Sequence, residues 1–166
     1  LTQLLPYTAT VTNPLDYTTP IWGDYERTLP VFKCLLEDGY DSAVLVQDYP
    51  AAGLDESKPN YRADSDSFIT ACQTASIPGA ICSTLPENLD SETRSHILQA
   101  GVAPMQGIKT CMQAMSAAAN YGKRRLALLA NPPHPFRRTP LLGSRFQQLD
   151  EATAKTILAD AGLNVP

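Results

Sequence analysis

Polar side chains stand in pairs directly after short apolar runs, and these pairs are the first candidates for chemistry. The four pairs are Asn13 with Asp16, Asp48 with Tyr49, Ser83 with Thr84, and Gln106 with Gly107. Ligands of an open parallel sheet bind outside the carboxyl ends of its strands, so we expect the pairs to share one edge of a sheet. A helix predicted to begin at the last pair adds free N–H groups, which favour an anion. Ordinary loop polarity explains the same pattern, and both interpretations stay open.

Two of the acidic positions have specific alternatives. Asp48 follows a strand-like run, as the phosphoacceptor aspartate of a receiver domain does. A receiver site also needs an acidic pair after an earlier strand and a lysine on a late strand, and neither is visible, so a turn-capping role competes. Asn13-Pro14 with Asp16 is typical of an Asx-type turn, and a ligand contact explains this segment equally well.

The remaining reactive side chains favour structural roles. His96 is predicted in the middle of a helix, and His134 lies between prolines beside Arg137-Arg138. We assign neither histidine a catalytic role, and the basic clusters, including Arg124-Arg125, are as consistent with solvated charge as with a phosphate contact. The four cysteines (Cys34, Cys72, Cys82 and Cys111) lack the close spacing of zinc ligands and are interpreted as buried free thiols in a reducing compartment, so no metal site is predicted.

The elements that must position these residues alternate between short strands and helices. Strands are predicted over residues 7–12, 42–47, 79–82 and 102–105. A helix ending before Pro6 is followed by helices over residues 25–37 (or from Thr28, because of Pro30), 63–75, 91–99 with Asp90 as N-cap, and from Gln106-Gly107 to Gly122. A long loop occupies residues 48–61. Helices that alternate with buried strands predict an α/β fold with a parallel sheet covered on both faces.

The character of the chain changes after Gly122. Residues 131–142 contain four prolines and cannot form regular secondary structure, so an extended Pro-rich connector is predicted over residues 123–147. A terminal helix follows over residues 151–160, with Asp150 as its N-cap.

The composition of the chain limits the classes to which this protein can belong. The chain has 166 residues, enough for one domain, and 43% of them are hydrophobic. A net charge of −4 argues against nucleic acid as a partner. No run approaches the length of a membrane span, and no signal peptide is visible, so we expect no membrane and a cytoplasmic location. The first residue is Leu, and we expect this chain to be a piece of a longer protein.

Several segments, taken in order, resemble one family, the NDP-forming acyl-CoA synthetases of the ADP-forming acetate–CoA ligase type, which are relatives of succinyl-CoA synthetase. VTNPLDY at residues 11–17 is similar to the NPxD segment of that family, and AVLVQDYP at residues 43–50 is similar to the strand that follows it. IPGAICSTLPENL at residues 77–89 and GVAPMQGIKTCMQAMSAAANYG at residues 101–122 resemble later segments of the same domain. LDEATAKTILADAGLNVP at residues 149–166 resembles the opening helix of the ATP-grasp domain.

The resemblance implies a domain order and a fold. Residues 1–122 would be a flavodoxin-like CoA-ligase domain without its first strand, residues 123–147 a connector, and residues 148–166 the first helix of an ATP-grasp domain. The implied architecture is a three-layer, flavodoxin-like parallel sheet with helices on both faces. The implied partners are other domains or subunits of the same ligase, and a homo-oligomer is possible.

The family's reaction converts a carboxylic acid, CoA and a nucleoside triphosphate to acyl-CoA, nucleoside diphosphate and phosphate, through an acyl phosphate and a phosphohistidine. ATP, Mg and CoA would be cofactors or substrates of the full enzyme. Because the family's Gly-rich turn, CoA-binding domain and phosphohistidine loop are absent here, we expect no catalytic residue and no activity in this chain alone. By carry-over, Asn13 and Asp16 would form a wall of the acyl-phosphate site, and Gln106 and Gly107 would meet an anion.

A non-catalytic role is the main alternative. A ligand-sensing or subunit-interface module of the same α/β class would use the same sheet edge. Binding of acyl-CoA without turnover by the intact protein would favour that interpretation.

Overall fold

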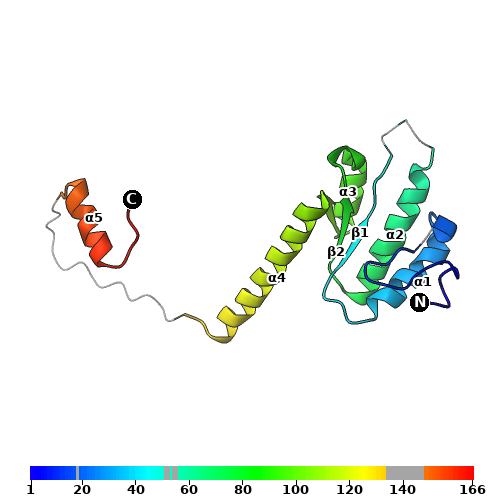
Figure 1. Cartoon of the computed structure of the whole chain (residues 1–166), viewed down its shortest axis with the longest axis horizontal. Helices are drawn as coiled ribbons and strands as arrows, with labels where there is room; N and C mark the ends of the chain where they lie inside the picture. The colour runs from blue at the N-terminus through cyan, green and yellow to red at the C-terminus, as the bar shows by residue number, and fades with distance from the viewer. Residues whose placement is uncertain (18, 51–52, 54–55, 134–147) are drawn as a thin grey trace. The chain divides into compact units, whose positions relative to one another are not determined.

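The computed structural model describes residues 1–17, 19–50, 53, 56–133 and 148–166 (Figure 1). It divides into two units, Leu1–Ala127 and Leu128–Pro166, which are described separately. The elements in chain order are η1 Thr19–Ile21, α1 Tyr25–Leu36, β1 Ala43–Val46, α2 Lys58–Ala75, β2 Gly79–Ser83, η2 Pro86–Asn88, α3 Ser91–Gln99, β3 Ala103–Gln106, α4 Ile108–Ala130 and α5 Glu151–Asp160. The predicted connector residues 134–147, with His134 and Arg137-Arg138, lie outside the described residues.

The three described strands form one parallel sheet in the order β1-β2-β3. The prediction of an α/β fold with a parallel sheet is therefore confirmed. Ile81, at the centre of β2, pairs in register with Leu45 of β1 and Pro104 of β3. Successive side chains of a strand point to opposite faces, so Ile81 and Leu45 lie on one face while Ala80, Cys82 and Val44 lie on the other.

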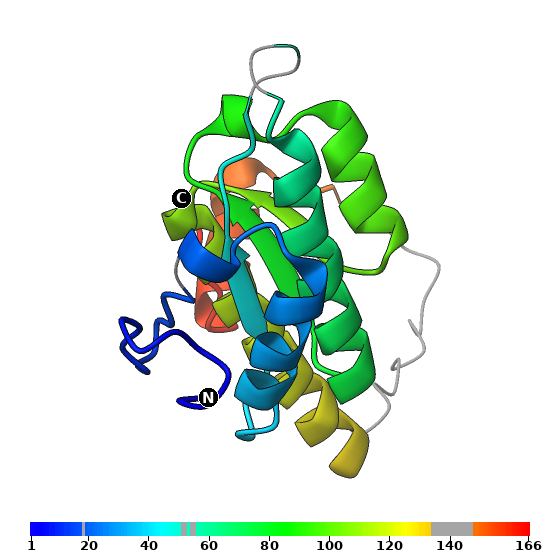
Figure 2. The ribbon, with the colours of Figure 1, turned by 90° about the vertical axis from the view of Figure 1, so that its right-hand side faces the viewer.

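The first face of the sheet is closed by a continuous apolar core. Its members come from α1, α2, α3 and the strands: Phe32, Leu36, Leu45, Tyr49, Phe68, Ile69, Ala71, Cys72, Ile81, Leu89, Ile97 and Val102. The rings of Phe32 and Phe68 meet edge to face with centroids 5.7 Å apart, a geometry that aromatic pairs prefer. Figure 2 shows α1 and α2 in front of the strands on this face.

The second face has a much smaller core. Ala80 and Cys82 of β2 and Cys111 of α4 form it, and Val44, Met105 and Met115 are half-buried around it. Val46 stays 47% exposed although it belongs to the sheet. From Met112 onward α4 is mostly exposed, so its first turns carry its packing against the strands.

Aspartates set the helix starts that the sequence predicts. The carboxylate of Asp24 accepts hydrogen bonds from the N–H groups of Glu26 and Arg27, and α1 begins at Tyr25 with Pro30 inside it. Asp90 and Asp150 accept from the N–H groups of Thr93 and Thr153 in the same way. The starts of α3 and α5 therefore confirm the capping prediction, because these N–H groups have no partner within the helix.

Four expectations about local structure are wrong. Residues 7–12 form no strand: their apolar side chains alternate, but the segment pairs with none of the described strands, and Tyr7 is fully exposed. The predicted helix end before Pro6 is a single turn. Helix α2 begins at Lys58 rather than at the predicted residue 63, and it includes the end of the predicted loop. Its first turn contains a proline, at a position where proline is favoured.

The fourth correction concerns the end of α4. The helix continues through Gly122 to Ala130, so the connector does not begin at residue 123. The Arg, Leu and Ala residues that follow Gly122 are strong helix formers, and together they outweigh the cost of one internal glycine, about 1 kcal/mol.

Candidate functional site

The carboxyl ends of the three strands bring three of the four predicted pairs to one edge of the sheet. Asp48 follows β1 and accepts a hydrogen bond from the Thr84 N–H at 2.8 Å, with a second bond from the Thr84 hydroxyl. The N–H of Leu85 lies 3.5 Å from the same carboxylate. The loops after β1 and β2 are thereby tied together through one side chain.

The pKa of Asp48 is consistent with these hydrogen bonds between the two loops. Burial raises the pKa of its carboxyl, but hydrogen bonds from Thr84, Asn88 and Leu85 outweigh that effect and lower the pKa below its ordinary value of 3.8. Asp48 is therefore ionised at neutral pH with both oxygens engaged in the loop. This arrangement supports the turn-capping interpretation, and it gives the phosphoacceptor hypothesis no support.

Gln106 and Gly107 stand at the same edge, where β3 ends and α4 begins. The Gln106 side-chain N–H donates to the Pro86 carbonyl at 2.7 Å, and the Gly107 N–H donates to the Ser83 carbonyl at 2.8 Å. Gly107 has a φ of +81°, a conformation that favours glycine. The first intrahelical bond joins the Cys111 N–H to the Gly107 carbonyl. The N–H groups of residues 108–110 thus have no acceptor within the helix, the arrangement that favours an anion.

Two polar side chains next to this edge are buried, and the sequence did not predict their burial. Gln47 follows β1 and lies in register with Ser83, since the Gln47 N–H donates to the Cys82 carbonyl at 2.9 Å. The Gln47 side-chain N–H donates to the Tyr61 carbonyl at 2.7 Å. Within the described part of the chain, the Gln47 Oε1 and Ser83 Oγ atoms are buried without a hydrogen-bond partner. The local sequence does not predict this burial, because the burial depends on α2 covering this end of the sheet.

Asn13 and Asp16 do not come from the end of a described strand. They follow no strand, because residues 7–12 are irregular. The Asn13-Pro14 peptide is cis. Asn13 and Pro14 line a groove of about 410 Å³ that runs beside β1. Met112 and Met115 of α4 line the same groove. Asp16 is exposed on the segment that leads into η1. The structure therefore groups Gln106 with Gly107, and places Asn13 on a groove wall.

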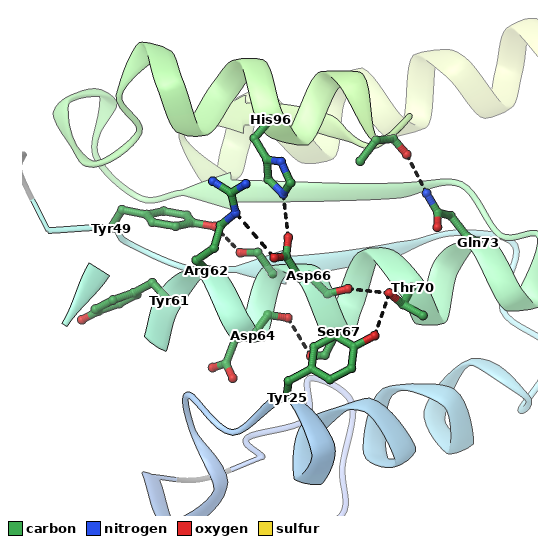
Figure 3. A network of polar contacts seen from close by, with 12 residues as sticks. Tyr25, Tyr49, Tyr61, Arg62, Asp64, Asp66, Ser67, Thr70, Gln73 and His96 are labelled. Carbon is green, nitrogen blue, oxygen red and sulfur yellow. Dashed lines mark hydrogen bonds and ion pairs between the residues drawn. The ribbon is translucent and has the colours of Figure 1, made fainter. Parts of the chain in front are cut away.

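A polar network inside α2 was also missed. Asp64 is fully buried, and its carboxylate accepts hydrogen bonds from the Tyr17 hydroxyl and the Gly23 N–H, both at 2.8 Å. Burial raises the pKa of Asp64, while these two bonds oppose the shift. The Thr28 and Ser67 hydroxyls lie 2.8 Å apart, and Figure 3 shows Asp64 and Ser67 on the same helix. These bonds fix the segment before α1 to α2, which is a structural role.

His96 joins α3 to α2. Its Nε2 lies 2.6 Å from Oδ1 of Asp66, and the Arg62 Nε lies 3.5 Å from Oδ2 of the same carboxylate. In Figure 3, His96 and Arg62 approach Asp66 from two sides. His96 lies within α3, as predicted, and its side chain is 28% exposed. This cluster links α2 to α3, and the Asp66 carboxylate contacts both His96 and Arg62.

The cysteines behave as small apolar residues. Cys72, Cys82 and Cys111 are buried, Cys34 is half-buried, and all four are free. Burial raises the pKa of both Cys72 and Cys82 to about 11, which makes their thiols poor nucleophiles. Within the described residues, no group of three or more His, Cys, Asp or Glu side chains is placed to hold a metal ion, and no helix is long and apolar enough to span a membrane.

Comparison with known proteins adds no family to these observations. A scan against protein-family models, a search of curated proteins and a search of solved structures each found no match for this chain.

Proposed function

We propose that this chain is the CoA-ligase domain of an NDP-forming acyl-CoA synthetase, followed by the first helix of its ATP-grasp domain. The order of the NPLD, STLPE, QG and LDEATAK segments along one chain supports the proposal. The parallel α/β sheet is the fold class that the resemblance implies. We further propose the finer, three-layer flavodoxin-like arrangement, with α1 to α3 on one face and α4 on the other.

The observation that carries the proposal is the start of α4 at the carboxyl edge of the sheet. There Gly107 turns the chain, and the N–H groups of residues 108–110 have no acceptor within the helix. An acyl phosphate is an anion that such groups would stabilise. Asp48 and Gln106 brace the adjoining loops, which would hold these amides in place as the charge on the phosphate changes.

In this proposal the chain supplies binding and orientation. Gln106 and Gly107 would contact the anionic group, and Asn13 with Asp16 would form a further wall of the acyl site. The chemistry of thioester formation, with ATP, Mg and CoA, would come from other domains or subunits of the ligase. The chain alone would therefore release no ADP.

The test is an assay of the parent polypeptide for ADP release with CoA, ATP and a panel of carboxylic acids. We expect acid-dependent and CoA-dependent release, with turnover reduced roughly tenfold or more by Gln106→Ala, Asn13→Ala or Asp16→Ala. Asn120→Ala, on the exposed side of α4, is the matched control. Unchanged turnover in all three variants would remove the residue assignments, and the absence of acid-dependent ADP release would remove the ligase.

A non-catalytic ligand-sensing or subunit-interface module is the second candidate. The groove beside β1 and the poorly covered second face of the sheet favour it, because such surfaces mark interaction sites. Binding of acyl-CoA without turnover by the parent polypeptide would select this function.

A further inference from the structure

Two cysteines from different elements meet on the second face of the sheet. Cys82 lies in β2 with its side chain on that face, and Cys111 lies in the first turn of α4. Both are fully buried, and with Ala80 they form the small core between β2 and α4. The other two cysteines take no part in it, since Cys72 belongs to the first-face core and Cys34 is half-buried in α1.

The backbone brings these two side chains together. The Gly107 N–H donates to the Ser83 carbonyl at 2.8 Å, and the Cys111 N–H donates to the Gly107 carbonyl at 3.0 Å. Cys111 is therefore one helical turn from a residue that is bonded to the neighbour of Cys82. Helical side chains tilt toward the N-terminus of their helix, so the Cys111 side chain leans back toward the end of β2.

The two thiols also interact directly. Burial raises the pKa of the Cys82 thiol, and the charge of the Cys111 thiol and a hydrogen bond with it raise that pKa further. A hydrogen bond requires close approach, so the two sulfur atoms are neighbours. Cys72 is the contrast, because burial alone raises the pKa of its thiol.

Only a thin layer of side chains separates the pair from solvent. Val44, Met105 and Met115 pack over the cluster, and each of them is only partly buried. Met112, which follows Cys111 in the chain, is 45% exposed. Methionine side chains are flexible, so a molecule as small as hydrogen peroxide reaches the thiols when they move.

We propose that Cys82 and Cys111 form a reversible disulfide in the presence of peroxide, which fastens the first turn of α4 to β2. The N–H groups of residues 108–110 belong to that same turn, and the disulfide would restrict their movement. The small core beneath α4 allows the closer approach that an S–S bond requires. The proposal does not depend on the proposed function.

The reaction consumes one peroxide and oxidises two thiols by two electrons. The thiolate of one cysteine attacks an oxygen of hydrogen peroxide and breaks the O–O bond, which leaves a sulfenic acid and releases hydroxide. The second thiolate attacks the sulfenic sulfur, forms the S–S bond and displaces a second hydroxide. The two thiol protons convert both hydroxides to water. Because buried thiols are poorly ionised, the reaction is slow, and the pair stays reduced where peroxide is scarce.

The test treats the folded chain with hydrogen peroxide, labels the remaining thiols with N-ethylmaleimide in denaturant, and maps the peptides by mass spectrometry. We expect two of the four thiols to escape labelling, joined as a Cys82–Cys111 bond within a monomer. Dithiothreitol should restore all four. Treatment in urea is the control for folding, because the unfolded chain closes the shorter loop between Cys72 and Cys82 more readily.

Three variants separate the pair from the other thiols. Cys82→Ala and Cys111→Ala should each abolish the cross-link. Cys72→Ala, which removes a cysteine buried on the other face, is the matched control and should form the cross-link as the parent does. Circular dichroism spectra establish that all three are folded.

Hydrogen exchange tests whether the disulfide fastens α4. We expect exchange of the Cys111 N–H to slow by about tenfold or more when the parent chain is oxidised, because local opening of this turn becomes rarer. Cys82→Ala keeps the same N–H group, and peroxide should leave its exchange unchanged.

Three outcomes overturn the proposal. Labelling of all four thiols after peroxide treatment of the folded chain would show that the pair does not react. A cross-link that forms only in urea, or that persists in Cys82→Ala or Cys111→Ala, would show that other cysteines are joined. A Cys82–Cys111 bond that leaves exchange of the Cys111 N–H unchanged would show that it does not fasten the helix.

Discussion

The two faces of the sheet differ in how completely they are covered. On the first face, Ile81 is fully buried beneath α1, α2 and α3, and two phenylalanine rings pack beside it. On the second face, α4 contributes Cys111 and Met115, while Val46 remains 47% exposed. Both faces belong to the same three strands, so the difference lies in the helices that cover them.

The first face therefore contributes mainly to stability, and the second face offers surface for interaction. The first face holds most of the buried apolar surface, which is the main favourable term in folding. The second face and the β1 edge leave apolar surface and backbone groups exposed, which is typical of surfaces that a partner covers. The comparison therefore predicts that equivalent substitutions on the two faces have unequal effects on the free energy of unfolding.

The largest effect should come from Ile81→Ala. This substitution leaves a cavity at the centre of the first-face core, and we expect a loss of about 3 kcal/mol in the free energy of unfolding. Val46→Ala, on the neighbouring strand but on the second face, should cost less than about 1 kcal/mol. Urea unfolding of both variants checks the pair, and equal losses would show that the faces contribute alike.

A smaller effect should distinguish two glycines. A Cβ atom added at Gly79 would lie 2.8 Å from the Cys72 sulfur, so Gly79→Ala should cost about 2 kcal/mol. The added Cβ at Gly122 meets nothing within 4 Å, and Gly122→Ala should stabilise α4 by about 0.5–1 kcal/mol. Thermal unfolding measures both shifts. A stabilising Gly79→Ala would mean that α2 can move away from β2 at little cost.

Asp48→Ala should cost about 1 kcal/mol at neutral pH, because it removes charge-assisted hydrogen bonds from the loop after β2. The folded-state pKa of Asp48 lies below 3.8. Its contribution to stability is therefore present above pH 3.8 and disappears as the pH falls through the folded-state pKa. Unfolding curves of parent and variant should converge in acid, and a difference that persists there would contradict the electrostatic role.

Asp64→Asn should produce the smallest change, with the opposite dependence on pH. Burial raises the pKa of Asp64 above 3.8, so ionisation opposes folding. This cost is absent below pH 3.8 and grows as the pH rises through the folded-state pKa. The variant should lose that decline in stability between acid and neutral pH. An unchanged pH profile would show that the Asp64 carboxylate is effectively solvated.

Local signals in the sequence predicted much of the secondary structure. Aspartate caps and glycine ends located α3 and α5, and the apolar run 43–46 located β1. The prediction failed where distant parts of the chain decide the outcome. Residues 7–12 have a strand pattern, but they pair with none of the described strands. Gly122 resembles a helix end, but helix formers continue beyond it.

The candidate site shows the same division. Gln106 and Gly107 were predicted from a strand that leads directly into a helix, and the structure places both at the sheet edge. The burial of Asp64, Gln47 and Ser83 was not predicted, because these polar residues become buried only when α2 packs across the sheet. Asn13 was expected at that edge and instead lines the groove beside β1.

Residue-resolved hydrogen exchange of the free chain tests the central difference most directly. Alternate residues of a parallel strand direct both backbone groups to the same neighbour, so the N–H groups of Val44 and Val46 point away from β2. The N–H group of Gln47, bonded to the Cys82 carbonyl at 2.9 Å, should be strongly protected, whereas those of Val44 and Val46 should exchange quickly. This result would establish that the β1 edge is closed toward β2 and open on its outer side. Equal protection of all three groups in a monomer would contradict the account, since it would mean that the outer edge of β1 is already paired.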